Sequence, residues 1–172
     1  MILKNNKGFT LIELLIYVGI FALVSGALVS FIITIINISA KNYVVQEVNS
    51  NSRLAIELIS ERIRSAADVN EGLSTFDADP GVLSLAMDVA GQNPTIIDLT
   101  ADDGRLQIKE GVDPVVYLTT DEVKVTDLQF KNITTSGLRN SIQVQMTIEY
   151  ADPSSRFYEY TKTLQTTITL RK

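Results

Sequence analysis

The chain of 172 residues contains no cysteine, no histidine and no tryptophan. Without cysteine and histidine it can form no disulfide, no thiolate or imidazole metal site, and no catalytic triad with a histidine base. An enzyme built from this sequence would have to work with carboxylates, lysine, tyrosine or serine alone.

Proline is absent from the first 79 residues, and the four prolines are Pro80, Pro94, Pro114 and Pro153. Proline inside a helix removes a backbone hydrogen bond and clashes with the preceding turn. One long helix can therefore run unbroken before Pro80, and the sequence predicts a change of architecture near that residue.

Charged side chains are absent from Leu14 to Ala40, a run of 27 residues. A helix of this length spans roughly 40 Å, which exceeds the roughly 30 Å hydrocarbon core of a bilayer. We therefore expect a single transmembrane helix. Lys4 and Lys7 precede the run, so the positive-inside rule predicts a cytoplasmic N-terminus, with the C-terminal domain outside.

Past the uncharged run, apolar and small residues recur at spacings of three and four, while charged residues fill the other faces. These residues are Val45, Val48, Ser52, Ala55, Ile59, Ile63 and Ala66. We expect one helix from Phe9 to about Asp68. Residues 9–40 would form its hydrophobic transmembrane segment, and residues 41–71 an amphipathic continuation that packs against the protein's own domain.

From Val82 onward the apolar period changes to two, which is typical of half-buried antiparallel strands. Ser141–Tyr150 alternates strictly. It is expected to form a hairpin with the last segment, across a turn at Ala151–Ser155.

A second hairpin is predicted earlier in the β-rich half, with Ile97 and Leu99 facing Leu106 and Ile108 across a turn that holds Asp103-Gly104. Val115–Tyr117 is expected to be a short strand. The apolar residues of Glu122–Phe130 change parity midway, which predicts a bulge near Thr126-Asp127.

These patterns predict an α+β fold in which a long N-terminal helix lies across the apolar face of an antiparallel β-sheet. The mainly β head, residues 72–172, holds 14 acidic and 9 basic residues, and this acidity disfavours generic nucleic-acid binding. Asp77, Asp79, Asp98, Asp102 and Asp103 fit no calcium-binding loop that we can define, so we predict no metal site and no cofactor.

A carboxylate, Glu13, stands at the start of the apolar run. The segment Lys7-Gly8-Phe9-Thr10-Leu11-Ile12-Glu13, after a short basic leader, resembles the class III signal of type IV pilins and type II secretion pseudopilins. The resemblance implies that residues 1–8 are a leader, that a prepilin peptidase cuts between Gly8 and Phe9, and that Phe9 is then N-methylated. The positively charged amine of a neighbouring subunit would pair with Glu13 in the assembled bundle.

Ala22, Gly26 and Ser30 form a row of small residues that would allow helices of other subunits to approach closely. Major subunits of the family commonly have a proline in the apolar helix and a cysteine pair near the C-terminus, and this chain has neither. The C-terminal half is similar to minor subunits of the J or W type.

The resemblance implies a structural, non-enzymatic protein: a minor pilin or pseudopilin that helps to initiate or cap a filament serving a pilus, competence or type II secretion. Its partners would be the prepilin peptidase, sibling subunits, the inner-membrane assembly platform and membrane lipid. It would lie in the inner membrane before assembly and in an extracytoplasmic filament afterwards. Two alternatives remain open: a tip adhesin that receives a ligand or DNA, for which Lys124, Lys131 and Arg139 could cluster, and an uncleaved single-pass sensor or carbohydrate-acting protein using paired carboxylates.

Overall fold

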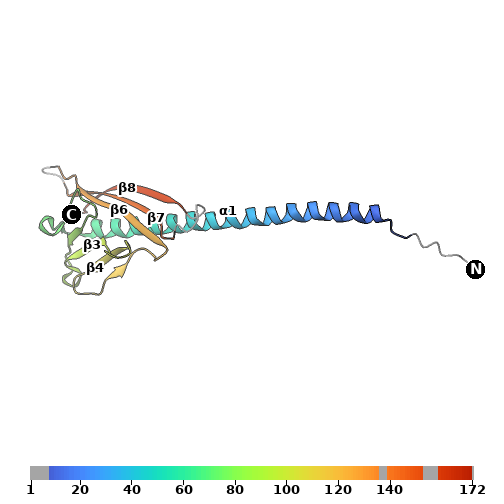
Figure 1. The fold of residues 1–172 in the computed structure, drawn as a ribbon. Coiled ribbons are helices and arrows are strands. Elements are labelled where there is room, and N and C mark those ends of the chain that lie inside the picture. The colour runs from blue at the N-terminus through green and yellow to red at the C-terminus, as the bar shows by residue number, and fades with distance from the viewer. Residues whose placement is uncertain (1–7, 136–138, 153–158, 172) are drawn as a thin grey trace, which may run out of the picture. The chain divides into compact units, whose positions relative to one another are not determined.

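The computed structural model describes residues 8–135, 139–152 and 159–171. Lys7 and most of the predicted turn at Ala151–Ser155 lie outside the described residues. The elements, in chain order, are α1 (Leu11–Ser65), β1 (Asp68–Val69), η1 (Glu71–Leu73), β2 (Leu83–Ala86), η2 (Ala90–Gln92), β3 (Thr95–Leu99), β4 (Leu106–Glu110), β5 (Val116–Tyr117), β6 (Val123–Asn132), β7 (Ser141–Tyr150) and β8 (Thr161–Thr169) (Figure 1).

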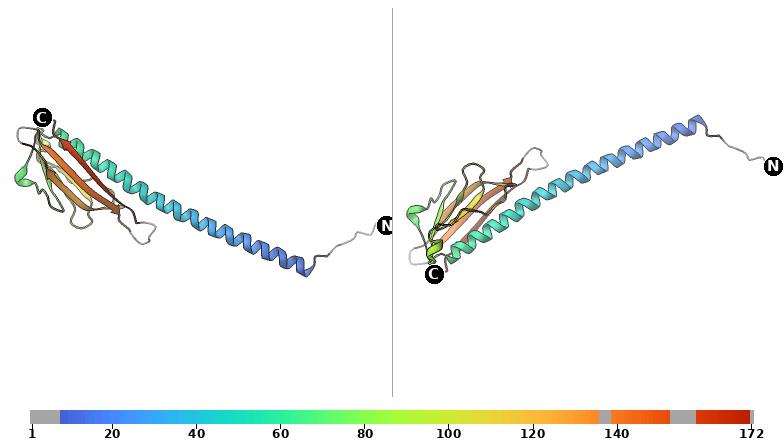
Figure 2. Two further views of the ribbon diagram at one scale, coloured as in Figure 1. Left: turned by 90° about the horizontal axis from the view of Figure 1, so that it is seen from above. Right: turned by 90° about the horizontal axis from the view of Figure 1, so that it is seen from below.

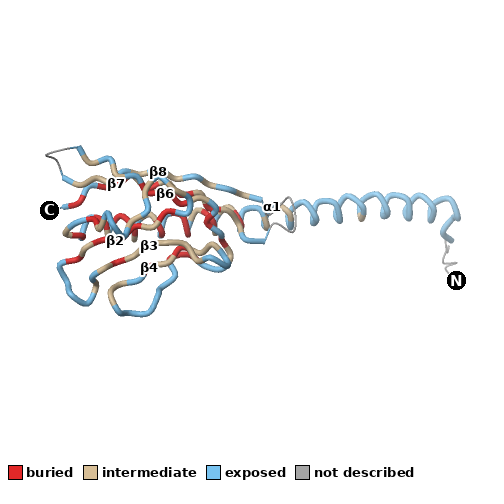
Figure 3. The backbone as a smooth tube through the Cα atoms, turned by 60° about the vertical axis from the view of Figure 1, so that its left-hand side comes forward, coloured by how far each residue is buried: buried red, intermediate tan, exposed pale blue. Residues whose placement is uncertain are grey.

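Contacts divide the chain into two compact units, Met1–Ala40 and Lys41–Lys172. In the first unit, the described residues form the beginning of α1. This helix is long and apolar enough to cross a membrane, by length and composition, and none of the residues in its most apolar stretch is buried. The pale blue of this stretch in Figure 3 shows the same exposure.

The C-terminal end of α1 differs from the prediction. The helix stops at Ser65, and the expected continuation through residues 66–71 is wrong, because Asp68 and Val69 form a strand that pairs with Ala86 and Leu85. The backbone N–H groups of Ala67 and Asn70 donate to the carbonyls of Ala86 and Ser84, each at 2.9 Å. Pairing with β2 thus replaces further helical hydrogen bonds.

In the second unit, one face of α1 forms the centre of the core, as the red segments of the helix in Figure 3 show. Its fully buried apolar residues are Val44, Val48, Ala55, Ile59 and Ile63. The prediction named Val45 in place of Val44, but Val45 is only half-buried. Val44 lies four residues before Val48 and so continues the buried stripe, whereas Val45 is rotated away from it.

The strands form two antiparallel sheets, where the sequence predicted one. The first has the order β1-β2-β3-β4-β5 and the second the order β6-β7-β8. Figure 2 shows the second sheet, in orange to red, beside the later part of α1. The long helix packed against antiparallel sheets confirms the predicted α+β class.

Both predicted hairpins are confirmed. Ile97 pairs with Ile108 and Leu99 with Leu106 across the β3–β4 turn, while β7 pairs with β8 in a register that places Met146 opposite Leu164. The short strand β5 is present, and the register of β6 against β7 shifts between Val125 and Asp127, where the bulge was expected.

The other edge of β6 is covered by loops of the first sheet. The carbonyl of Gly104 accepts from the N–H of Val125 at 2.9 Å, and the carbonyls of Leu128 and Phe130 accept from Gly81 and Asp77 at 2.7 and 2.9 Å. Gly104 has φ +65°, and a Cβ placed on it would lie 3.1 Å from the carbonyl oxygen of Val125. Glycine at this turn therefore allows the first sheet to close against β6.

Candidate functional site

The candidate site is the start of α1, where the first described residues precede a helix that carries an acidic side chain in its first turn. Thr10 is the cap of this helix. Its carbonyl accepts from the N–H of Leu14 at 3.1 Å, and its hydroxyl oxygen accepts from the N–H of Glu13 at 3.3 Å. A threonine that caps the helix three residues before a glutamate has the spacing of a capping box.

Glu13 is exposed and belongs to the first turn of α1. A carboxylate is favoured here because the helix N-terminus carries unpaired N–H groups and the positive end of the helix dipole. Within the described part of the chain, Glu13 takes part in no ion pair. The Glu13 carboxylate is therefore available to pair with a cation that the described residues do not supply.

Gly8 and Phe9 precede the helix and belong to no regular secondary-structure element. Both are exposed, and a Cβ added to Gly8 would meet no atom within 4 Å. The ring of Phe9 lies 5.5 Å from that of Tyr17, at an interplanar angle of 44°. The peptide bond between Gly8 and Phe9 is thus accessible, while the Phe9 side chain contacts Tyr17 in the second turn of the helix.

The row of small residues lies along the exposed surface of the same helix. Ala22, Gly26 and Ser30 are all exposed, and a Cβ on Gly26 would meet nothing within 4 Å. Packing against the described residues of this chain therefore does not require glycine at position 26. Thr34 extends the row by one helical turn, and its hydroxyl donates to the carbonyl of Ser30 at 2.9 Å.

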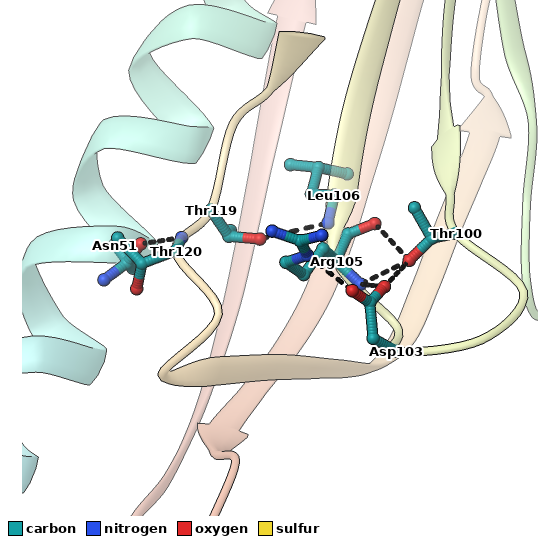
Figure 4. A network of polar contacts seen from close by, with 7 residues as sticks. All are labelled: Asn51, Thr100, Asp103, Arg105, Leu106, Thr119 and Thr120. Carbon is teal, nitrogen blue, oxygen red and sulfur yellow. Dashed lines mark hydrogen bonds and ion pairs between the residues drawn. The ribbon is translucent and has the colours of Figure 1, made fainter. Parts of the chain in front are cut away.

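A polar network in the second unit fixes α1 to the loop before β6. The N–H of Thr120 donates to the side-chain oxygen of Asn51 at 2.9 Å (Figure 4). The Asn51 amide and the Thr120 hydroxyl both donate to the Glu47 carboxylate, at 2.8 and 3.2 Å. Figure 4 also shows Thr119, whose hydroxyl oxygen accepts from the N–H of Leu106 at 3.1 Å. The loop is thus tied to both the helix and β4.

The same figure shows a second polar group at the β3–β4 turn. Asp103 accepts from the hydroxyl of Thr100 and from the side chain of Arg105, whose Nε lies 2.6 Å from the carboxylate (Figure 4). The Thr100 hydrogen bond, followed by those from Arg105, lowers the pKa of Asp103. These contacts explain Asp103 as a turn residue.

The basic residues considered for DNA do not form one cluster. Lys124 and Lys131 lie on the same strand, seven residues apart, which corresponds to about 23 Å. Lys131 lies 4.0 Å from Asp77, and Arg139 donates to the carbonyl of Arg171 at 2.9 Å. Among the described residues, no group of three or more acidic residues is arranged to hold a metal ion.

Two features of the site were not predicted from the sequence. Thr10 was not identified as the helix cap, although the pattern Thr-x-x-Glu before an apolar run is a recognised start signal. The network of Asn51 and Thr120 gave no local signal, because its members are 69 residues apart in the chain.

Comparison with known families shows that residues 3–29 match the prokaryotic N-terminal methylation motif. This range includes Gly8, Phe9, Glu13, Ala22 and Gly26 and ends just before Ser30. No curated protein and no solved structure matches the chain significantly.

Proposed function

Because the chain carries the prepilin N-methylation motif, the class III signal of the type IV pilin and pseudopilin family, we propose that it is a minor pilin or pseudopilin that helps to initiate or cap a filament. Prepilin peptidase removes residues 1–8, and the new N-terminal residue, Phe9, is methylated. The helix then joins a bundle of sibling helices, with the acidic head on the extracytoplasmic side of the inner membrane.

The observation that carries this proposal is the position of Glu13. An exposed carboxylate in the first turn of a helix of membrane-spanning length is costly in lipid unless a cation neutralises it. Cleavage before Phe9 creates such a cation on every subunit. The amine of a neighbour can reach Glu13 in the bundle, where the low dielectric strengthens the pairing.

Helix packing supplies the second part of the proposal. The row of Ala22, Gly26 and Ser30 presents little side-chain bulk, so a second helix can approach its backbone closely. Close approach brings more atoms into van der Waals contact, which is the main attraction between helices that are surrounded by lipid. The pairing of Glu13 would set the axial register of neighbouring helices. The row of small residues would set the distance between them.

Two features support a minor rather than a major subunit. The described part of α1 has no proline-induced break in its apolar segment, and the chain has no cysteine pair to close a C-terminal loop. The tip adhesin alternative gains no support from the described basic residues, since these lie apart and two of them already have partners.

Processing can be tested by producing the full chain together with a prepilin peptidase and determining the mature N-terminus. We expect a methylated N-terminus at Phe9. Gly8→Val should leave the leader attached, because a branched side chain would stand at the bond that is cut. Gly19→Val is the matched control, since Gly19 is also exposed with nothing within 4 Å of an added Cβ, and it should be cleaved normally. An intact Met1 in the parent protein would contradict the proposal and favour the uncleaved sensor.

A further inference from the structure

The outer edge of β8 is open. Leu170 donates its N–H to the carbonyl of Asn140 at 2.9 Å, and Tyr160 accepts from Tyr150 at 3.3 Å, so the even-numbered residues of this segment bond to β7. The odd-numbered residues therefore direct their N–H and C=O groups away from β7. They are Thr161, Thr163, Gln165, Thr167 and Thr169, all exposed. Within the described ranges, these outward backbone groups have no hydrogen-bond partner.

The contrast with β6 is informative, because the two strands are the opposite edges of the same sheet. The loops at Asp77, Gly81 and Gly104 cover the free edge of β6 through backbone hydrogen bonds. An open edge is a template for pairing with another chain, and proteins usually cover it or keep it short. β8 offers nine residues without such cover.

A groove runs beside this edge, between β8 and α1. Its lining residues are Asn49, Arg53, Ile56, Glu57, Lys162 and Leu164. Ile56 and Leu164 pack against the core while remaining partly exposed, so they form an apolar floor. Figure 2 shows β8 running alongside this part of α1 in both views.

The groove carries an excess of positive charge, although the whole chain has a net charge of −5. Arg53 and Lys162 line it opposite one acid, Glu57. The Lys162 amine donates to the side-chain oxygen of Asn49 at 2.6 Å, which holds the cation at the wall of the groove. Farther along α1, Arg64 and Arg171 lie in a second depression with Glu57 and Glu61.

We propose that this groove binds an extended, acidic segment of a partner protein by β-strand addition. The partner's backbone pairs with the outward groups of β8, and its alternate side chains lie on Ile56 and Leu164. Its carboxylates face Arg53 and Lys162, which selects acidic over basic segments. This interaction goes beyond filament assembly through α1 and does not depend on cleavage of the leader.

The test uses the full chain in detergent micelles and a fluorescent peptide, long enough to span β8, in which every second residue is threonine and the positions between are valine and glutamate in turn, so that valine and glutamate share the face toward the groove. Fluorescence anisotropy should show saturable binding. A peptide with lysine in place of glutamate should bind about tenfold more weakly, a difference that corresponds to about 1.4 kcal/mol. Equal binding of both peptides, or no binding of the acidic one, would overturn the proposal.

Two variants locate the site. Gln165→Pro removes one outward N–H but leaves the bonds to β7 intact, since proline is tolerated where an edge strand faces solvent, and it should weaken binding about tenfold relative to Gln165→Ala. Arg53→Glu should weaken binding similarly. Lys109→Glu makes the same charge change at an exposed position of β4 and should leave binding within about twofold.

If Arg53→Glu and Lys109→Glu weakened peptide binding equally, binding would depend only on the net charge of the protein. That result would refute the groove as the binding site. Concentration-dependent dimers that Gln165→Pro abolishes would also refute it, because the edge would then be occupied by a second copy of this chain.

Discussion

The hydroxyl of Tyr43 donates a 2.7 Å hydrogen bond to the carboxylate of Glu122 and so links α1 to the segment that leads into β6. Tyr150 donates to the same carboxylate oxygen at 3.3 Å. The network of Glu47, Asn51 and Thr120 involves the next two turns of α1. Together, these contacts attach the part of α1 that begins the second unit to the β-rich part of the chain. The attachment gives rise to a pH-dependent prediction.

The hydrogen bond to Glu122 raises the pKa of Tyr43 to about 12. The folded state thus favours the neutral phenol, and this contribution to stability is complete below the unperturbed pKa of about 10. It is lost as the pH rises from about 10 to about 12. Chemical unfolding of the full chain and of Tyr43→Phe, followed by circular dichroism, should show a stability difference at neutral pH that disappears over this range. A constant difference would contradict the assignment.

The turn at Gly104 gives a prediction about backbone conformation. Gly104→Ala forces a side chain into a left-handed backbone and against the carbonyl of Val125, so we expect a loss of about 1–2 kcal/mol in the free energy of unfolding. Gly72→Ala is the control, because an added Cβ there would meet nothing within 4 Å. It should change stability by less than about 0.5 kcal/mol. Equal effects in thermal unfolding would show that the first sheet does not depend on this turn.

The core face of α1 gives a prediction about packing. Ile59 is fully buried, and Ile59→Ala should lower the free energy of unfolding of the head by about 2–5 kcal/mol through lost burial and the cavity left behind. Leu54 lies on the same helix but is 51% exposed, so Leu54→Ala should cost less than about 1 kcal/mol. Denaturant titration of both variants measures the difference. Comparable losses would mean that α1 does not pack as described.

Local patterns predicted much of the fold. The strict alternation of Ser141–Tyr150 predicted which side chains of β7 are buried, and the parity change in Glu122–Phe130 located the bulge, because strand periodicity is a property of neighbouring residues. The dipeptide Asp103-Gly104 also predicted the turn between β3 and β4, because Asp-Gly is typical of hairpin turns.

Features that depend on distant residues were not predictable in this way. The end of α1 at Ser65 depends on pairing of β1 with β2, and the division of the strands into two sheets depends on which edges the loops cover. For the candidate site, the motif at Gly8, Phe9 and Glu13 was visible in the sequence. The cap at Thr10 was not predicted, although its spacing to Glu13 is a local signal, and its hydrogen bonds identify it.

The exposed small-residue row provides a further prediction about assembly. Gly26→Val adds bulk where a neighbouring helix would approach, and should reduce recovery of the processed protein in filaments severalfold. Leu23→Val is a matched control, since Leu23 is exposed and already bulky. Equal recovery of both variants would exclude close helix contact at Gly26.

The central claim is that the Glu13 carboxylate meets the amine of a neighbouring subunit. Glu13→Gln keeps the size and polarity of the side chain but removes the charge. The most direct measurement is the fraction of processed protein that enters filaments in cells with the complete assembly system, for the parent and for this variant. We predict that Glu13→Gln is cleaved before Phe9 as efficiently as the parent but enters filaments at least about tenfold less, a ratio equivalent to about 1.4 kcal/mol. Parental levels of the uncharged variant in filaments would contradict the account.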